Sequence, residues 1–172
     1  DVIGESKIPS GHAPIKRVYL EPSNLKPLPA AVHAIERADF ILIGPGSLYT
    51  SIIPNLLVKG IGQAVIRAKG EKIYIANLMT QQGETSHYTA SQHIEAIHSH
   101  VGESFIESVL INEKDLPSSI CENYREENAE PVKFDIDRIK DMGINIIQKE
   151  IALVHKGTVR HDANNLADWL CE

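Results

Sequence analysis

The sequence predicts an α/β protein with a three-layer, Rossmann-like architecture, in which a mostly parallel sheet carries helices on both faces. Apolar runs of strand length alternate with segments of helical period, which is typical of parallel strands joined by right-handed crossovers. The 172 residues are 42% hydrophobic and 23% charged, a composition that suits one globular domain with a core of its own. We therefore expect residues 1–172 to belong to a single domain.

Short apolar runs bounded by turn residues locate the predicted strands. They are residues 17–20, 40–43, 72–76, 108–112, 131–134 and 144–147, with 151–154 as a further candidate. Residues 40–43 are apolar throughout, which is typical of a strand covered on both sides. We expect this strand to lie in the centre of the sheet.

Prolines, caps and apolar periodicity locate the predicted helices. Pro29 is suited to the first position of a helix, and Thr89 with Gln92 forms a capping-box pattern before residues 90–101. A short helix is expected after Pro54, with Gly60 interrupting it before residues 61–68. Further helices are predicted at residues 136–141 and 163–170, whereas residues 116–128 form a polar excursion.

Charge and cysteine usage exclude several classes of partner. The net charge is -6 and the 17 Lys and Arg residues are scattered, so we expect binding to neither nucleic acid nor an anionic membrane. Cys121 and Cys171 lie far apart, which favours a reducing cytoplasm over a disulfide-stapled secreted module. The chain begins at Asp1 without an initiator methionine, which indicates a fragment.

The run from Gly44 to Ser51 is the most informative stretch, because an apolar strand leads there into a turn rich in glycine and hydroxyl groups. Glycines allow main-chain N–H groups to approach an anion, and the side chains of Ser47 and Thr50 are short hydroxyl donors. The spacing matches neither the dinucleotide fingerprint nor the lysine-containing NTPase loop. It predicts phosphate binding, with an ordinary strand-to-helix turn as the alternative.

A second polar loop, residues 77–85, follows the next predicted strand. Open α/β sheets bind ligands beyond the carboxyl ends of their strands. If the two strands are near neighbours, then Asn77, Thr80 and Gln81 face a common cleft with Gly46 and Ser47. The amide side chains of Asn77 and Gln81 could bind a base, a sugar or a carboxylate.

The sequence assigns no catalytic residue and no metal site. The spacing of His87, His93, His98 and His100 does not bring these side chains together on a helix. His161 could be a general base, but an N-cap role for Asp162 beside an exposed His161 is favoured.

Four segments, in order and at coherent spacing, resemble the YvcK family of bacterial gluconeogenesis factors, which are related to the phospholactate transferase CofD. They are Gly4-Glu5-Ser6-Lys7-Ile8, residues 44–56, residues 77–85 and Arg160-His161-Asp162. Full-length members are nearly twice as long and open with a glycine-rich phosphate turn that this chain lacks. The resemblance is therefore to the carboxy-terminal half, a CofD-like domain incomplete at its N-terminus.

The resemblance implies a cytoplasmic, Rossmann-like protein that binds a UDP-linked amino sugar such as UDP-N-acetylglucosamine. Such proteins direct carbon into cell-wall precursors and maintain cell shape, with no cofactor required, and a metabolic enzyme or a second copy is a candidate partner. The alternative is a CofD-like transferase that moves a phospho-lactyl group from a nucleotide diphosphate donor to an acceptor hydroxyl. That reaction would use a divalent metal on the phosphates.

The resemblance also implies the ligand-binding residues. It places the turn near the ligand phosphates, the second loop beside it, and an aromatic and a cationic side chain on the sugar nucleotide. The candidate residues are Gly44, Pro45, Gly46, Ser47, Leu48, Thr50, Asn77, Thr80, Gln81, Tyr124 and Arg160. The alternatives are that Tyr124 is a surface aromatic in a loop and that Arg160 pairs with Asp162.

Overall fold

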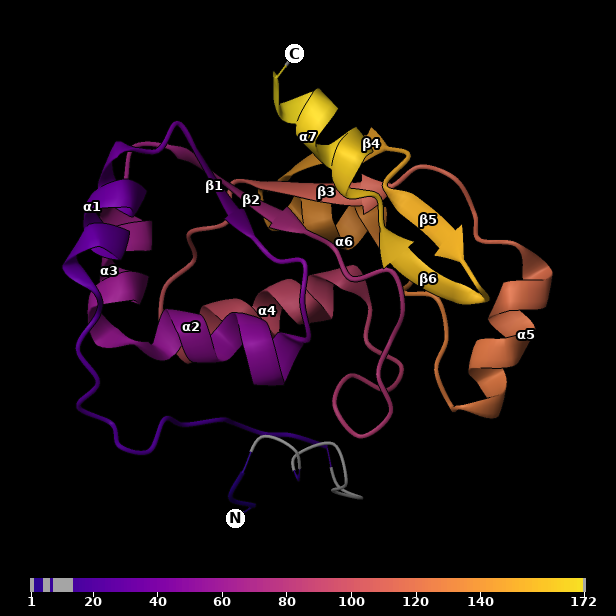
Figure 1. Ribbon diagram of the computed structural model, residues 1–172, viewed down its shortest axis with the longest axis horizontal. Coiled ribbons are helices and arrows are strands. Elements are labelled where there is room, and N and C mark those ends of the chain that lie inside the picture. Colours follow the sequence, from indigo (N-terminus) through magenta and orange to yellow (C-terminus); the bar gives the residue numbers. More distant parts are fainter. Residues whose placement is uncertain (1, 5–6, 8–13, 172) are drawn as a thin grey trace.

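A computed structural model describes residues 2–4, 7 and 14–171, and its centre is a parallel four-stranded sheet (Figure 1). The strands lie in the order β1-β2-β3-β4. Their bounds are Phe40–Ile43 (β1), Glu71–Ile75 (β2), Ser108–Asn112 (β3) and Asn145–Lys149 (β4). A separate antiparallel hairpin joins Ala152–His155 (β5) to Thr158–His161 (β6). The predicted α/β class with a mostly parallel sheet is confirmed.

Helices fill most of the remaining chain. They are α1 (Pro29–Arg37), the π-helical turn η2 (Leu48–Ile52), α2 (Ile53–Leu57), α3 (Lys59–Arg67), α4 (Ala90–Val101), α5 (Ser118–Glu126), α6 (Ile136–Asp141) and α7 (Ala163–Cys171). The predicted capping box is present, because the Thr89 side chain accepts from the main-chain N–H of Gln92 and the Gln92 side chain accepts in return. None of the helices in the described part of the chain is both long and apolar enough to cross a bilayer.

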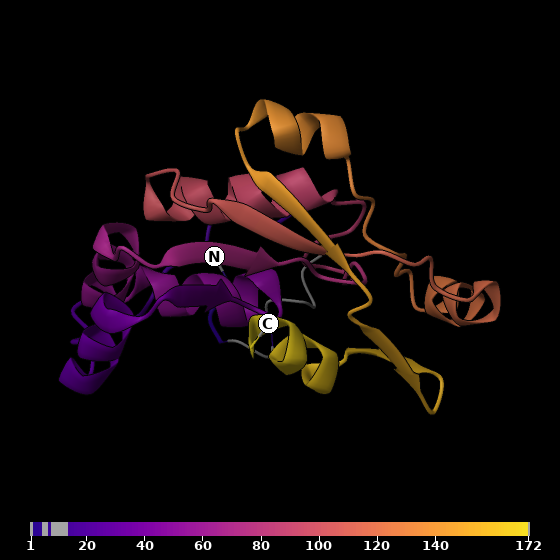
Figure 2. The same ribbon diagram turned by 90° about the horizontal axis from the view of Figure 1, so that it is seen from above.

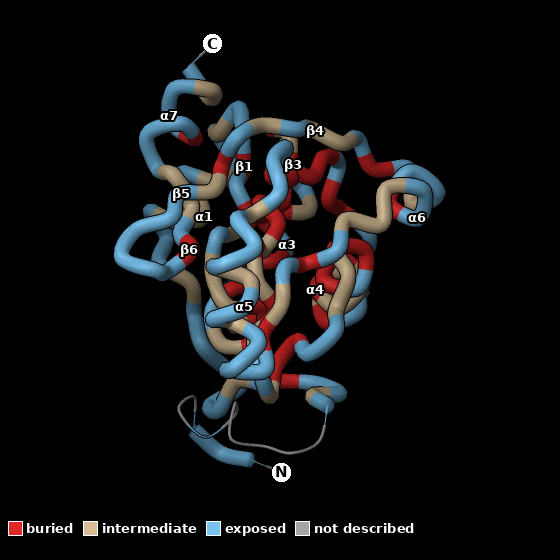
Figure 3. Tube along the Cα trace, turned by 90° about the vertical axis from the view of Figure 1, so that its right-hand side faces the viewer, coloured by how far each residue is buried: buried red, intermediate tan, exposed pale blue. Residues whose placement is uncertain are grey.

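The sheet has a different cover on each face. On one face, β-strand residues such as Ile43 and Val109 pack with Ile94 of α4 and Ile139 of α6. The opposite face packs against the hairpin and α7 through Leu166. Figure 2 shows α4 and α6 on one side of the strands and α7 on the other. In Figure 3 the buried residues concentrate in the strands and α4. Helices on both faces, as predicted, are confirmed.

The expectation that residues 40–43 form a central strand is wrong. β1 lies at one end of the sheet and, within the described residues, pairs only with β2. Ile41 and Ile43 are buried under the helices of the first face, whereas Phe40 is 49% and Leu42 is 38% exposed on the second. The hairpin and α7 pack on β2 and β3, and the described residues leave this part of β1 partly exposed.

Two other predicted strands do not form. Residues 17–20 form no ladder, and the main-chain N–H of Val18 donates instead to His100 Nε2 at 3.1 Å. Residues 131–134 make only isolated bridges, Met79 with Pro131 and Thr89 with Lys133.

The polar excursion at 116–128 contains α5, an amphipathic helix with no buried residue. This helix was not predicted from the sequence, because the segment is polar.

The predicted helix break at Gly60 lies two residues earlier, at Val58, whose extended backbone separates α2 from α3. Gly60 is inside the first turn of α3, and a Cβ atom there would lie 2.4 Å from Pro27 Cγ. The glycine is therefore required by the close approach of the segment before α1, not by a break in the helix.

We predict that Gly60→Ala lowers the free energy of unfolding by about 1–3 kcal/mol, because the proline ring cannot move aside without disturbing its neighbours. Urea denaturation measures the change. In a Pro27→Ala background the same substitution should be neutral or stabilising, since alanine has the higher helix propensity. Equal losses in both backgrounds would contradict the proposed contact.

Candidate functional site

The turn after β1 begins with a backbone conformation that glycine favours. Gly44 has φ +94°, and a Cβ atom built there would lie 3.2 Å from the carbonyl oxygen of Ile75 at the end of β2. A side chain would combine a strained φ with a tight contact to a main-chain atom. Gly44 thereby lets the chain leave β1 directly across the carboxyl end of its neighbour.

The next residues present main-chain donors. The N–H groups of Gly46, Ser47 and Leu48 donate no hydrogen bond to any described residue. Ser47 is the N-cap of η2, and its carbonyl oxygen accepts from Ser51 N at 3.0 Å and Ile52 N at 2.9 Å. The first N–H groups of a helix have no intrahelical acceptor, so they are available to a ligand. The Leu48 side chain is buried, which leaves only its main chain for such a contact.

Asn77 joins the two predicted loops. Its Nδ2 donates to the Gly46 carbonyl oxygen at 2.9 Å, and its Oδ1 accepts from the Tyr74 hydroxyl at 2.7 Å. The structure thus brings the loops after β1 and β2 together at the carboxyl edge of the sheet. Both polar groups of the Asn77 side chain have protein partners, so this residue positions the turn from within.

Thr80 and Gln81 hold the second loop in place. The Thr80 hydroxyl accepts from Glu130 N at 3.0 Å, and the Thr80 N–H donates to the Glu130 carbonyl oxygen at 2.7 Å. Gln81 N donates to the Thr85 hydroxyl at 3.0 Å. Thr80 is buried, and its contacts tie the loop to the segment after α5.

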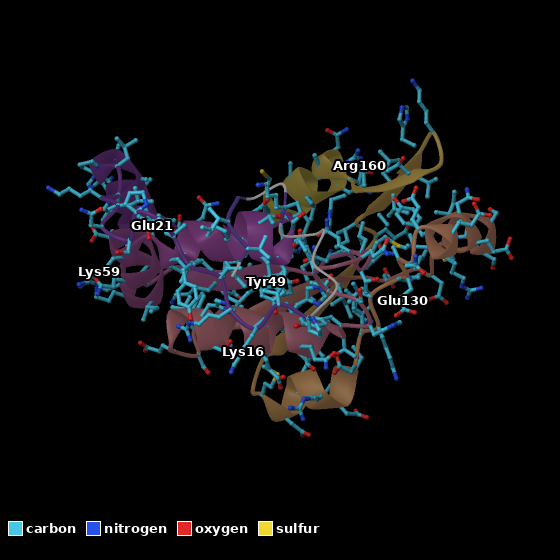
Figure 4. The ribbon with its side chains drawn as sticks, turned by 90° about the horizontal axis from the view of Figure 1, so that it is seen from below. Lys16, Glu21, Tyr49, Lys59, Glu130 and Arg160 are labelled. Carbon is cyan, nitrogen blue, oxygen red and sulfur yellow. The ribbon has the colours of Figure 1, made fainter. Side chains whose placement is uncertain are left out.

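Polar side chains lie behind the turn as well. The Thr50 hydroxyl donates to Glu84 Oε1 at 3.3 Å, and Glu84 is buried. The hydroxyls of Tyr49 and Tyr88 are 2.8 Å apart, and Tyr49, labelled in Figure 4, is buried. Burial, with the Tyr88 hydrogen bond, raises the pKa of Tyr49. Thr50 thus connects the turn to a buried carboxylate.

Tyr124 and Arg160 are linked through the hairpin. The Tyr124 hydroxyl accepts from the main-chain N–H of Val159 at 2.9 Å, so this tyrosine holds α5 against β6. Arg160 is exposed on the hairpin (Figure 4). Among the described residues no ion pair joins it to Asp162, whose Oδ1 caps α7 by accepting from Asn164 N and Asn165 N. The N-cap prediction for Asp162 is confirmed.

His161 differs from its prediction as an exposed residue. It is half-buried, and its Nε2 lies 3.0 Å from the carbonyl oxygen of Ala76, the residue after β2. Burial lowers the pKa of His161, which the Ala76 hydrogen bond partly opposes. Side chains alternate along a strand, so the apolar Val159 in the sequence could have indicated that His161 points inward too.

Three histidines of α4 have separate structural roles. The ring of His98 accepts from Ile106 N at 3.3 Å, and that of His100 accepts from Val18 N. His93 contacts the Thr89 carbonyl oxygen at 2.8 Å. Burial lowers the pKa of all three imidazoles. No group of three or more His, Cys, Asp or Glu side chains in the described ranges could hold a metal ion.

Comparison with known proteins identifies the family. The family model described as 2-phospho-L-lactate transferase CofD matches residues 1–152. The chain belongs to the CofD family. It is 48% identical to the gluconeogenesis factor of Bacillus subtilis (strain 168) and 42% identical to that of Halalkalibacterium halodurans, over 99% of this chain in each case. A crystal structure of a UPF0052 family member from Bacillus halodurans superposes with a TM-score of 0.95 at 42% identity and covers 99% of this chain.

The chain spans about half the length of these relatives, covering 54% and 53% of the two gluconeogenesis factors and 55% of the crystallised chain. The CofD match contains the turn at Gly44, the second loop and Tyr124, but it ends before Arg160 and His161. Of the first motif that resembles the family, Glu5, Ser6 and Ile8 lie outside the described residues.

We predict that Asn77→Ala lowers the free energy of unfolding by about 1–3 kcal/mol, because it removes the acceptor of the fully buried Tyr74 hydroxyl. Urea denaturation tests this. Asn55→Ala is the matched control, since the exposed Asn55 amide also donates to a carbonyl oxygen, that of Ser51. In a Tyr74→Phe background the cost should shrink, and an unchanged cost there would contradict the buried-hydroxyl explanation.

Proposed function

We propose that this chain is the sugar-nucleotide-binding part of a regulatory protein whose ligand resembles UDP-N-acetylglucosamine. The relatives that are named gluconeogenesis factors support this proposal. In this proposal, ligand binding connects carbon metabolism to the supply of cell-wall precursors and to cell shape in the cytoplasm, through contact with an enzyme of amino-sugar metabolism.

The observation that carries the proposal is the set of main-chain N–H groups at Gly46, Ser47 and Leu48, which have no acceptor among the described residues. They occur in succession at the start of η2, where the helix leaves its first amides without internal acceptors. Phosphate oxygens accept such bonds strongly, because hydrogen bonds to a charged acceptor are about twice as strong as neutral ones. A chain of net charge -6 needs donors of this local kind to attract a diphosphate.

The second candidate function is a CofD-like phospho-lactyl transferase. It is favoured by the family match and by the buried Glu84. The Glu84 carboxylate lies behind the turn and accepts a hydrogen bond from the Thr50 hydroxyl. In that reaction an acceptor hydroxyl would attack the phosphorus that carries the lactyl group, and a base would accept the hydroxyl proton. The bond from that phosphorus to the bridging oxygen would break, and the nucleoside monophosphate would leave with that oxygen. Calorimetry with UDP-N-acetylglucosamine and GDP on the complete polypeptide distinguishes the two. Binding without turnover supports the regulator, and metal-dependent product formation supports the transferase.

We predict that Ser47→Asp weakens UDP-N-acetylglucosamine binding by about tenfold or more, because a carboxylate at the start of η2 repels the diphosphate. Ser47→Asn is the matched control, since the asparagine side chain has nearly the same shape as aspartate but no charge. Calorimetry on the complete polypeptide measures both. If the Asp and Asn variants bind equally, the diphosphate does not occupy the turn.

We also predict that Arg160→Ala costs about 1.5–3 kcal/mol of UDP-sugar binding, if the guanidinium hydrogen-bonds to phosphate. Lys156→Ala removes another exposed cation from the same hairpin and controls for net charge. Titration at low and high salt separates a direct contact from screened attraction. An unchanged affinity for Arg160→Ala would remove this residue from the site.

A further inference from the structure

His161 is directed toward the sheet by the alternation of β6. Val159, on the same face of the strand, is buried in the second core with Ile75 and Leu166. Arg160 faces the other way and is paired across the hairpin with Leu153, which is also exposed. Of the two neighbouring polar residues, His161 is therefore the one that reaches the carboxyl end of a sheet strand.

The hydrogen bond to Ala76 fixes the tautomer of the His161 ring. A carbonyl oxygen only accepts, so Nε2 must carry the hydrogen and donate across the 3.0 Å contact. Burial keeps the pKa of His161 below its usual range, so the ring is neutral at pH 7. Nδ1 is then an acceptor with a lone pair, and it makes no hydrogen bond to any described residue.

His161 lies close to the turn that begins at Gly44. Ala76 directly follows Ile75, the residue whose carbonyl oxygen lies against Gly44. Asn77, the next residue, holds the Gly46 carbonyl oxygen. Three successive residues at the end of β2 therefore contact the turn or the His161 ring, which places the imidazole beside the groups that would surround the diphosphate.

We propose that His161 is a ligand-binding residue whose Nδ1 accepts a hydrogen bond from a sugar hydroxyl next to the ligand phosphates. A neutral acceptor cannot pair with a phosphate oxygen, which also only accepts, so the partner must be a donor. His161 thereby selects for the sugar part of the ligand, while the amides of the turn bind its phosphates. This inference rests on the proposed function and names one further contact within it.

His161→Gln tests the assignment, because the glutamine amide nitrogen can take the place of Nε2 and still donate to Ala76, whereas no atom replaces Nδ1. We expect its thermal unfolding midpoint to stay near the wild-type value and its affinity for UDP-N-acetylglucosamine to fall by about three- to tenfold. His155→Gln is the control, since His155 is exposed on the same hairpin, and its affinity should not change.

Calorimetry on the complete polypeptide uses two probes, UDP-N-acetylglucosamine and UDP. A loss for both assigns the contact to the ribose, and a loss for the first alone assigns it to the hexose. Both results support the inference. Wild-type binding with unchanged affinity of His161→Gln overturns it and leaves the proposed function intact, whereas absence of wild-type binding overturns the proposed function and this inference together.

Nitrogen-15 NMR of the histidine rings provides a second measurement, made on the wild-type protein. A variant is needed only to assign the His161 resonance. We expect the Nε2–H tautomer in the free protein and a shift of the Nδ1 resonance when UDP-N-acetylglucosamine binds. A free protein with the hydrogen on Nδ1, or an Nδ1 resonance that does not move on binding, would overturn the inference.

Discussion

The handedness of parallel crossovers is the constraint on which this structure depends. Strands joined through a helix connect in the right-handed sense almost without exception. When the strands then lie in sequence order from β1 to β4, the crossover helices α2, α3, α4 and α6 fall on the same face of the sheet. The exception is α5, in the β3–β4 connection, which packs toward the hairpin. Among the described residues, the opposite face is covered mainly by the C-terminal segment, the β5–β6 hairpin and α7, with Ile120 and Tyr124 of α5 packed against the same cluster. The carboxyl edge, the hairpin and the polar loops are thereby brought into one region of the molecule.

Two asparagines hold that region together in the same way. Asn77 follows β2 and binds the Gly46 carbonyl oxygen, while Asn112 ends β3 and its Oδ1 accepts from Ile151 N and Ala152 N at 2.9 and 3.0 Å. Each amide thus fixes main chain that is distant in sequence at the end of a parallel strand. The turn and the hairpin are positioned by amide side chains at or just beyond the ends of sheet strands, so neither depends on loop packing alone.

Much of the fold could be predicted, because its elements carry local patterns. The strand 108–112 and the Thr89 capping box were both predicted from residues within one element. What could not be predicted depends on long-range placement. A four-residue apolar run does not reveal whether a neighbour covers it, so the exposure of Phe40 was missed. The turn at Gly44 was recognised, but the internal role of Asn77 and the inward direction of His161 depend on partners 31 and 85 residues away.

The position of β1 has a consequence for handling this polypeptide in solution. One side of the strand pairs with β2, and the other side presents main-chain donors and acceptors that no described residue satisfies, beside the partly exposed rings and methyl groups of Phe40 and Leu42. Such an edge is a template for intermolecular strand addition. The isolated 172-residue chain is therefore expected to self-associate as its concentration rises, and dilute samples are the appropriate ones for quantitative work.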